Sequence, residues 1–245
     1  MGRWARMGAA LLVVATGFPS QDQAREAKIR VLVITGGHAF EREPFFTLFQ
    51  GYPDIEYREV QHPKAHDLFK PEAARDYDVL VLYDMWQEIG EEARANFVAL
   101  LKQGKGVVAL HHSLAGYQDW EEYARIIGGR FRLQKRGEAG VERPPSTFKH
   151  GVRFTVHIAD PAHPVTRGLK DFEIVDETYG NFEVDSRVKP LLTTDEPSSG
   201  KVIGWCHTYG KSRIVYIQLG HDHTAYENPN YRRLVVQAIR WVKGP

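Results

Sequence analysis

Four apolar, strand-like segments of this sequence each end in a histidine or a carboxylate. The segments are residues 31–38, 107–112, 172–177 and 214–222. In an open parallel sheet, ligands bind beyond the carboxyl ends of the strands, so titratable groups at several of those ends would share one pocket. A core strand has no structural need to end in such a group four times over. The recurrence therefore indicates an enzyme site.

Strand-like and helix-like segments alternate along most of the chain, which is typical of an α/β fold. Strands are expected at residues 31–35, 77–83, 106–110, 201–207 and 213–219, and at 55–60, which is polar enough for a sheet edge. Helices are expected at 43–50, 91–103, 120–127 and 231–242. From about residue 131 to 195 the pattern predicts an antiparallel insertion, with strands at 154–158 and 172–175. These signals favour one flavodoxin-like α/β domain over residues 29–245, a three-layer sandwich with a mostly parallel sheet.

The first 28 residues have the pattern of a secretory signal peptide. Arg3 and Arg6 precede an apolar run at residues 7–18, and a polar stretch follows at 20–28. The apolar run is too short to span a bilayer with margin, and a basic start before an apolar middle is typical of export signals. We therefore expect a periplasmic or secreted protein, with an uncleaved anchor or an unstructured tail as the alternatives.

Charge and cysteine content limit the partners and the chemistry. The net charge of +1 gives no electrostatic reason to expect nucleic acid or a membrane surface as a partner. The oligomeric state stays open, a homo-oligomer included. The single cysteine, Cys206, precedes His207, but neighbours in a strand point to opposite faces. Cys206 is therefore expected to be a small core side chain and not a nucleophile.

Histidines are expected in the turns after the first and fourth strands. His38 directly follows two glycines, which let the backbone turn sharply close to a ligand; a histidine on the surface of the loop is the alternative. His111, His112 and Ser113 lie where the fourth strand meets its loop, a place where many α/β enzymes present a nucleophile. Imidazole suits proton transfer or metal binding. One of the two histidines is expected in the site, while the other packs.

Two further strands are followed by carboxylates and by a histidine. Of Asp176 and Glu177 we favour Glu177, which shares the alternation phase of Val175, an apolar residue expected to face the core; a shielded carboxylate can act as acid or base. His221 follows the last strand and is expected to meet His38 and His111. Three histidines with a carboxylate suit Zn²⁺ with an open position, although the sequence has no HExxH motif. A divalent ion on these three histidines is the one cofactor that the pattern suggests.

Aromatic side chains crowd the same segments and suit a sugar, whose axial C–H face is apolar while its hydroxyls form hydrogen bonds. The residues expected to contact such a substrate are Gly37, Phe40, Trp86, His112, Ser113, Tyr117, Tyr179, His207 and Asp222. Four other histidines lack a comparable place and are expected to be structural or on the surface: His62, His66, His150 and His157.

Five segments are informative as a set because of their order and spacing. They are VLVITGGHAF (31–40), YDVLVLYD (77–84), GKGVVALHHSLAGYQDW (104–120), HPVTRGLKDFEIVDETYGNF (163–182) and PSSGKVIGWCHTYGKSRIVYIQLGHD (197–222). In them the chain resembles the ThuA-like (trehalose-utilization) family, whose fold is similar to that of the class I glutamine amidotransferases. The resemblance covers about residues 29–243. It implies that His111 stands in place of the amidotransferase cysteine, and that His221 matches the amidotransferase histidine, with Asp222 where a Pro-Glu pair is expected.

The sequence favours an exported enzyme that processes a glycoside or a keto-sugar of the trehalose type by isomerisation, elimination or hydrolysis. His111 and Glu177 are the expected acid–base pair, because a positioned base can remove the acidic C–H beside a carbonyl. His38 and His221 are expected to stabilise an oxyanion or to bind a metal. Two alternatives stay open: a non-catalytic carbohydrate-binding protein on the same fold, and a metal-dependent hydrolase. Glutamine hydrolysis is not expected without the elbow cysteine.

Overall fold

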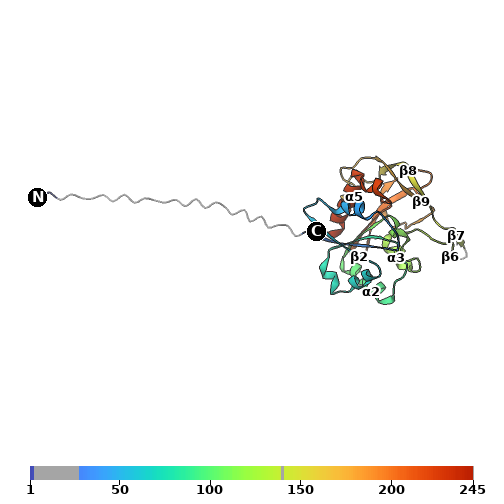
Figure 1. Ribbon diagram of the computed structural model, residues 1–245, viewed down its shortest axis with the longest axis horizontal. Helices are drawn as coiled ribbons and strands as arrows, with labels where there is room; N and C mark the ends of the chain where they lie inside the picture. Colours follow the sequence, from blue (N-terminus) through green and yellow to red (C-terminus); the bar gives the residue numbers. More distant parts are fainter. Residues whose placement is uncertain (3–27, 139–140, 245) are drawn as a thin grey trace.

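The computed structural model describes residues 1–2, 28–138 and 141–244 (Figure 1). The predicted signal peptide falls almost entirely outside the described residues. Within those ranges, no helix has both the length and the apolar character that crossing a bilayer requires.

A nine-stranded sheet forms the centre of the molecule, in the order β2-β1-β3-β4-β13-β12-β11-β8-β9. Neighbouring strands from β2 to β13 pair in parallel, and those from β13 to β9 pair antiparallel. The strand bounds are β1 Ile29–Gly36, β2 Ile55–Gln61, β3 Val79–Asp84, β4 Gly106–Leu110, β8 Thr147–Ile158, β9 Phe172–Gly180, β11 Lys189–Thr193, β12 Val202–Tyr209 and β13 Ser212–Ile217. The predicted insertion therefore extends the central sheet, and the more polar β2 lies at its edge as expected.

Short strands make two further pairs beside the central sheet. β5 (Gly129–Arg130) pairs with β10 (Glu183–Val184), and β6 (Arg136–Glu138) pairs with β7 (Val141–Arg143). In Figure 1 the β6–β7 hairpin projects from the body of the molecule.

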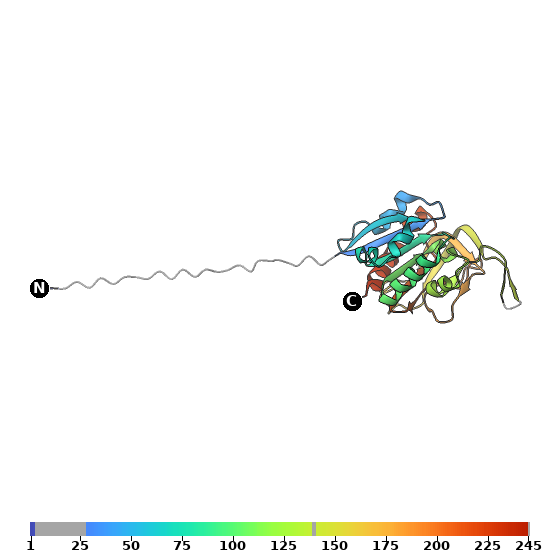
Figure 2. The same ribbon diagram turned by 90° about the horizontal axis from the view of Figure 1, so that it is seen from below.

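Helices cover both faces of the sheet, because alternate residues of its central strands are apolar on both sides. Val31 and Val33 of β1 share a core with α1 (Arg42–Phe46), α4 (His223–Tyr226) and α5 (Pro229–Lys243). Leu32 and Ile34 share the opposite core with α2 (Glu91–Gln103) and α3 (Glu121–Ile127). Figure 2, seen from below, shows α2 in front of the sheet. The α/β sandwich with three layers is confirmed.

Four short 3-10 helices complete the described elements, and one of them changes a prediction. They are η1 Thr47–Phe49, η2 Lys64–Phe69, η3 Ala73–Asp76 and η4 His111–Ala115. The single helix predicted at 43–50 is wrong in form, since α1 ends at Phe46 and continues as η1.

The two insertion strands are longer than predicted. β8 begins at Thr147, seven residues before the alternating apolar pattern. The pattern does not predict this start, because the first five residues of the strand are exposed and show no apolar alternation. β9 continues to Gly180. The pairing of β8 with β9 shifts register between Lys149 and Val152, and Gly151 there has a φ of +65°, a left-handed conformation that glycine adopts at low cost.

Candidate functional site

The fourth strand presents His111 at the carboxyl edge of the sheet. All residues of β4 are buried, and the chain turns sharply after it, with a φ of +49° at His111. The Nδ1 atom of His111 lies 2.6 Å from the carbonyl oxygen of Gln218. Because a carbonyl only accepts, Nδ1 donates its proton there, and this hydrogen bond fixes the ring orientation. The Nε2 atom of His111 therefore faces the opposite way.

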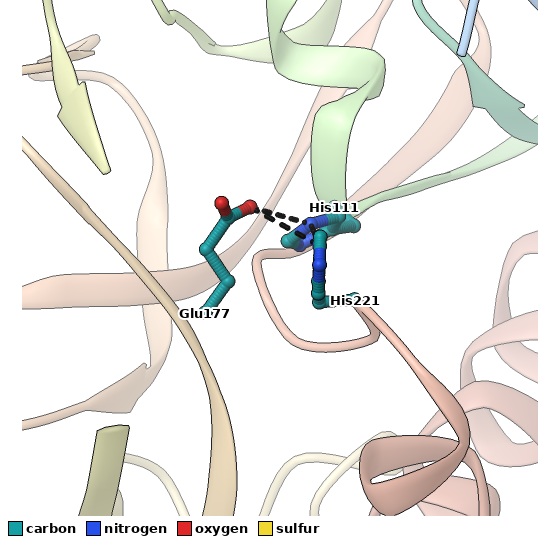
Figure 3. Close-up of side chains that lie close together, drawn as sticks. All are labelled: His111, Glu177 and His221. Atoms are coloured by element: carbon teal, nitrogen blue, oxygen red, sulfur yellow. Dashed lines mark hydrogen bonds and ion pairs between the residues drawn. The ribbon is translucent and has the colours of Figure 1, made fainter. Parts of the chain in front are cut away.

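Glu177 and His221 meet His111 at that nitrogen. Oε2 of Glu177 lies 3.0 Å from His111 Nε2 and 3.4 Å from His221 Nδ1. The two ring nitrogens are 3.2 Å apart. Figure 3 shows the three side chains converging from η4, from strand β9 and from the loop after β13. We call His111, Glu177 and His221 the histidine–carboxylate trio. Three of the four predicted strand ends therefore meet in one place.

Asp176, the neighbour of Glu177, positions the trio and does not join it. Its carboxylate accepts hydrogen bonds from the backbone N–H groups of Gly220 at 2.7 Å, of His221 at 3.0 Å and of Glu177 at 2.8 Å. Burial raises the pKa of Asp176. Two of these donors, Gly220 and His221, belong to the loop that carries His221, so Asp176 holds this loop against strand β9.

The electrostatics of the trio centre on Glu177. Burial alone would raise the pKa of Glu177, but hydrogen bonds from His111 and His221 outweigh burial and hold that pKa well below its usual range. The hydrogen bond with Glu177 raises the pKa of His221. Glu177 is therefore ionised near neutral pH and attracts positive charge to this point.

His150 lies at the surface as predicted, with a side chain that is 58% exposed, but it also reaches Glu177, a contact that the sequence does not predict. Its Nδ1 lies 3.1 Å from the second carboxylate oxygen, Oε1, and its ring centroid is 4.6 Å from that of His221. The register shift of β8 at Gly151 turns His150 toward Glu177. A histidine followed by glycine inside a strand was the available signal, because such a glycine indicates a bulge.

His112 and His38 stack beside the trio. The rings of His38 and His112 are 4.5 Å apart and nearly parallel. His112 is buried, and burial lowers its pKa well below the usual value. Partial burial likewise lowers the pKa of His38. Of the two adjacent histidines, His111 therefore belongs to the trio, and His112 packs behind it.

The other predicted contact residues divide into those near the trio and those away from it. The hydroxyl of Tyr179 lies 2.9 Å from His111 Nε2. Ser113 is buried, and Asp222 caps α4 by accepting from the N–H of Thr224 at 2.9 Å. Phe40 packs on Tyr83.

Trp86 and Tyr117 contact a different histidine, His62. At Gly37 a side chain would meet the backbone of Met85 at 2.6 Å, so only glycine fits that turn.

The placement of His207 in the site is wrong. His207 of β12 pairs with Ile214, which pairs with Val107 at the start of β4, whereas the trio lies beyond the Ile217–Leu110 pair. Three residues of strand separate these positions by about 10 Å. The physical reason is direction: β12 runs antiparallel to β13, so its last residues lie at the opposite edge of the sheet.

The described part of the chain contains one group of three side chains whose ligand atoms could hold a metal ion. It consists of His111, Glu177 and His221, whose ligand atoms all lie within 4.8 Å of one another. The predicted ligand set of His38, His111 and His221 is therefore corrected at one position, since Glu177 takes the place given to His38.

One family model matches nearly the whole described chain. The model of the ThuA family, described as trehalose utilisation, matches residues 30–242. A search of curated proteins finds no match. A ThuA-like protein from Parabacteroides merdae has a similar structure, with a TM-score of 0.73, 19% identity and coverage of 89% of this chain and 90% of that one.

Two further solved structures share the fold. A ThuA-like protein from Bacteroides uniformis aligns with a TM-score of 0.66 and 20% identity over 92% of this chain and 95% of that one. A glutamine amidotransferase from Thermotoga maritima aligns with a TM-score of 0.50 and 13% identity over 89% and 99%. At these identities the structures show the fold alone. The family match spans nearly all of the described residues, and the chain therefore belongs to the ThuA family.

Proposed function

We propose that this chain is an enzyme that acts on a carbohydrate, a glycoside or keto-sugar of the trehalose type, with the histidine–carboxylate trio as its catalytic centre. The convergence of His111, Glu177 and His221 within 3.0–3.4 Å at the carboxyl edge of the sheet supports the proposal. The family description, trehalose utilisation, supports a carbohydrate as the substrate.

The trio offers the groups that proton transfer at a sugar carbon needs. A carbonyl beside a ring carbon acidifies its C–H, so a positioned base can remove that proton while an acid protonates the oxygen. His111 is oriented through its Nδ1, and Glu177 shares its carboxylate with His111 and His221. An ionised Glu177 suits the role of base or charge partner, which leaves the imidazole of His221 as the acid. Isomerisation and elimination begin with such a transfer, and hydrolysis results when water adds to the product of the elimination.

The site does not support glutamine hydrolysis, although a glutamine amidotransferase shares the fold. The turn after β4 carries an imidazole at His111. The only cysteine of the sequence, Cys206, lies in β12, and burial raises its pKa to about 11. A thiol of that pKa is almost entirely protonated at neutral pH and is a poor nucleophile. The expectation that Cys206 is a core side chain is confirmed.

The proposal is tested by incubating the protein with trehalose, its 3-keto derivative and related glycosides, with products followed by NMR and mass spectrometry. We expect turnover, and a loss of at least about 100-fold in kcat/KM for His111→Asn. Asparagine removes the imidazole and tolerates the left-handed backbone of this position better than alanine. His223→Ala is the matched control, since His223 is an exposed histidine of the adjacent segment that pairs with Glu41.

The outcomes separate an enzyme from a binding protein. Equal turnover by His111→Asn and by the unchanged protein would contradict the assignment of the trio. Sugar recovered unchanged, with a raised melting temperature, would instead show a carbohydrate-binding protein. We also propose export, supported by the basic and apolar start of the sequence; cell fractionation and the mass of the mature chain would test it.

A further inference from the structure

We infer that the histidine–carboxylate trio is a binding site for a divalent transition-metal ion, with Zn²⁺ as the ion to test. The inference deepens the proposed function and rests on it for the identity of the substrate. It is carried by the geometry of His111, Glu177 and His221 and by the groups that hold them.

The Nε2 atom of His111 has more polar neighbours than one ring nitrogen can form hydrogen bonds with at the same time. Oε2 of Glu177 lies at 3.0 Å, the hydroxyl of Tyr179 at 2.9 Å and Nδ1 of His221 at 3.2 Å. A ring nitrogen has either one proton or one lone pair in the plane of the ring, so it forms one good hydrogen bond. Hydrogen bonds at this nitrogen therefore cannot satisfy all three contacts. A cation held by Nε2 of His111, Nδ1 of His221 and Oε2 of Glu177 takes one lone pair from each of these atoms, and the hydroxyl of Tyr179 then lies beside the site.

The spacing of the three ligand atoms matches the spacing around a tetrahedral ion. The triangle of Nε2, Nδ1 and Oε2 has sides of 3.0, 3.2 and 3.4 Å. Ligands at about 2.0–2.1 Å from a tetrahedral Zn²⁺ ion lie about 3.3 Å from one another. An ion can therefore enter the trio with side-chain shifts of a few tenths of an ångström.

Outer contacts hold the ligands as they do in established metal sites. The Nδ1–H of His111 donates to the carbonyl oxygen of Gln218, which directs the lone pair of Nε2 toward the centre of the trio. Nδ1 of His150 lies 3.1 Å from Oε1 of Glu177, which leaves Oε2 for the ion. Partners of this kind orient metal ligands, and the carbonyl of Gln218 also raises the basicity of His111 as a ligand.

The trio is buried at His111 and Glu177 and reaches solvent at His221. The side chains of His111 and Glu177 are 1% and 7% exposed, whereas that of His221 is 23% exposed. Three protein ligands with one open position are typical of catalytic zinc sites, and two imidazoles favour a transition metal over Ca²⁺ or Mg²⁺. An ion here would polarise the carbonyl of a keto-sugar as a Lewis acid, in place of a protonated histidine, and its three ligands would then hold the ion and would not act as acid or base.

The inference is tested by titrating the metal-free protein with Zn²⁺ in a calorimeter, without any sugar. We expect one saturable site per chain, weakened at least about 100-fold by Glu177→Gln and by His221→Gln. His223→Ala and His157→Ala are matched controls, because both remove an exposed histidine that pairs with a carboxylate. Both are expected to leave the dissociation constant unchanged. Circular dichroism and the melting temperature of each variant confirm that it folds.

A spectroscopic measurement adds an independent readout. Co²⁺ bound in place of Zn²⁺ should give visible absorption of the tetrahedral type, lost in Glu177→Gln. No saturable site in the unchanged protein, or the same affinity in the trio variants as in the controls, would overturn the inference.

The two proposals fail separately. Turnover of a keto-sugar by the metal-free protein, with no Zn²⁺ binding, would leave the proposed function standing and remove the metal site. One bound Zn²⁺ with no conversion of any sugar would do the reverse.

Discussion

Two histidine–carboxylate groups lie at the carboxyl edge of the same sheet, and they differ in access to solvent. One is the trio, which reaches solvent through His221 and is bordered by His150, whose side chain is 58% exposed. The other is His62 with Asp84, at 2.8 Å, with side chains 0% and 1% exposed. We call His62 and Asp84 the buried pair. The two groups share residue types and a strand-end location, so those features alone do not separate a reactive centre from a structural one.

The surroundings of the buried pair explain its closure. The ring of Trp86 stacks on His62 at 5.4 Å, and the hydroxyl of Tyr117 lies 3.3 Å from His62 Nε2 and 3.1 Å from His66. Asp84 ends β3, and His62 follows β2. The pair therefore connects the ends of two strands across β1 and is shielded from solvent. We expect it to hold this edge of the sheet, whereas the trio reaches solvent through His221.

Truncating the buried pair tests this division with the largest expected effect. Asp84→Ala should lower the free energy of unfolding by about 3–5 kcal/mol, because it leaves a buried histidine without its partner. Urea unfolding measures the loss. The kcat/KM per folded molecule should stay within about twofold of the unchanged protein. A large fall in activity with unchanged stability would place the buried pair in the active centre.

The matching truncation in the trio should do the opposite. Glu177→Ala should lower kcat/KM by about 100-fold or more, which corresponds to about 2.7 kcal/mol of transition-state stabilisation. Its free energy of unfolding should change by less than about 1 kcal/mol, because the side chain of His221 is partly exposed and water can reach the trio from that side. Steady-state kinetics and urea unfolding of the same preparation measure both quantities.

A reversed pattern in the two truncations would break the comparison. If Glu177→Ala unfolded the protein as strongly as Asp84→Ala does, both groups would be structural. Activity per folded molecule is the deciding measurement, since a drop in total activity alone would follow from either cause.

Local patterns in the sequence were sufficient for the parallel half of the sheet. The apolar runs of β1, β3 and β4 predict buried strands because both of their faces are covered by helices. Gly104, with a φ of +105°, ends α2 as a left-handed cap, so this helix agrees with its predicted bounds. Glu177 and not Asp176 joins the trio, but the alternation argument for this preference is wrong, because Phe172 and Ile174 are the core residues of β9 and share the phase of Asp176, whereas Val175 is only partly buried.

The rest of the site depends on register and direction, which a local pattern does not contain. His150 reaches Glu177 only through the register shift of β8 against β9, and the exposed start of β8 gives no apolar signal. His207 lies away from the trio because β12 runs antiparallel to β13. The hydrogen bond from His111 to Gln218 uses a backbone carbonyl, which no side-chain motif encodes. Exposure separates the trio from the buried pair, and it too arises only from the packed structure.

The smallest expected effect concerns His150, which lies outside the trio and contacts two of its members, Glu177 and His221. His150→Ala removes the contact with Oε1 of Glu177 at 3.1 Å and leaves that oxygen to water. Loss of an outer partner of this kind should lower kcat/KM, and the affinity for Zn²⁺, by about 10-fold, which corresponds to about 1.4 kcal/mol. Stability should not change, because the side chain is exposed. His157→Ala on the same strand is the control, since it removes an exposed histidine paired with Asp171. Equal kinetics and equal Zn²⁺ affinity in the two variants would show that the bulge of β8 places His150 beside the trio without a role in it.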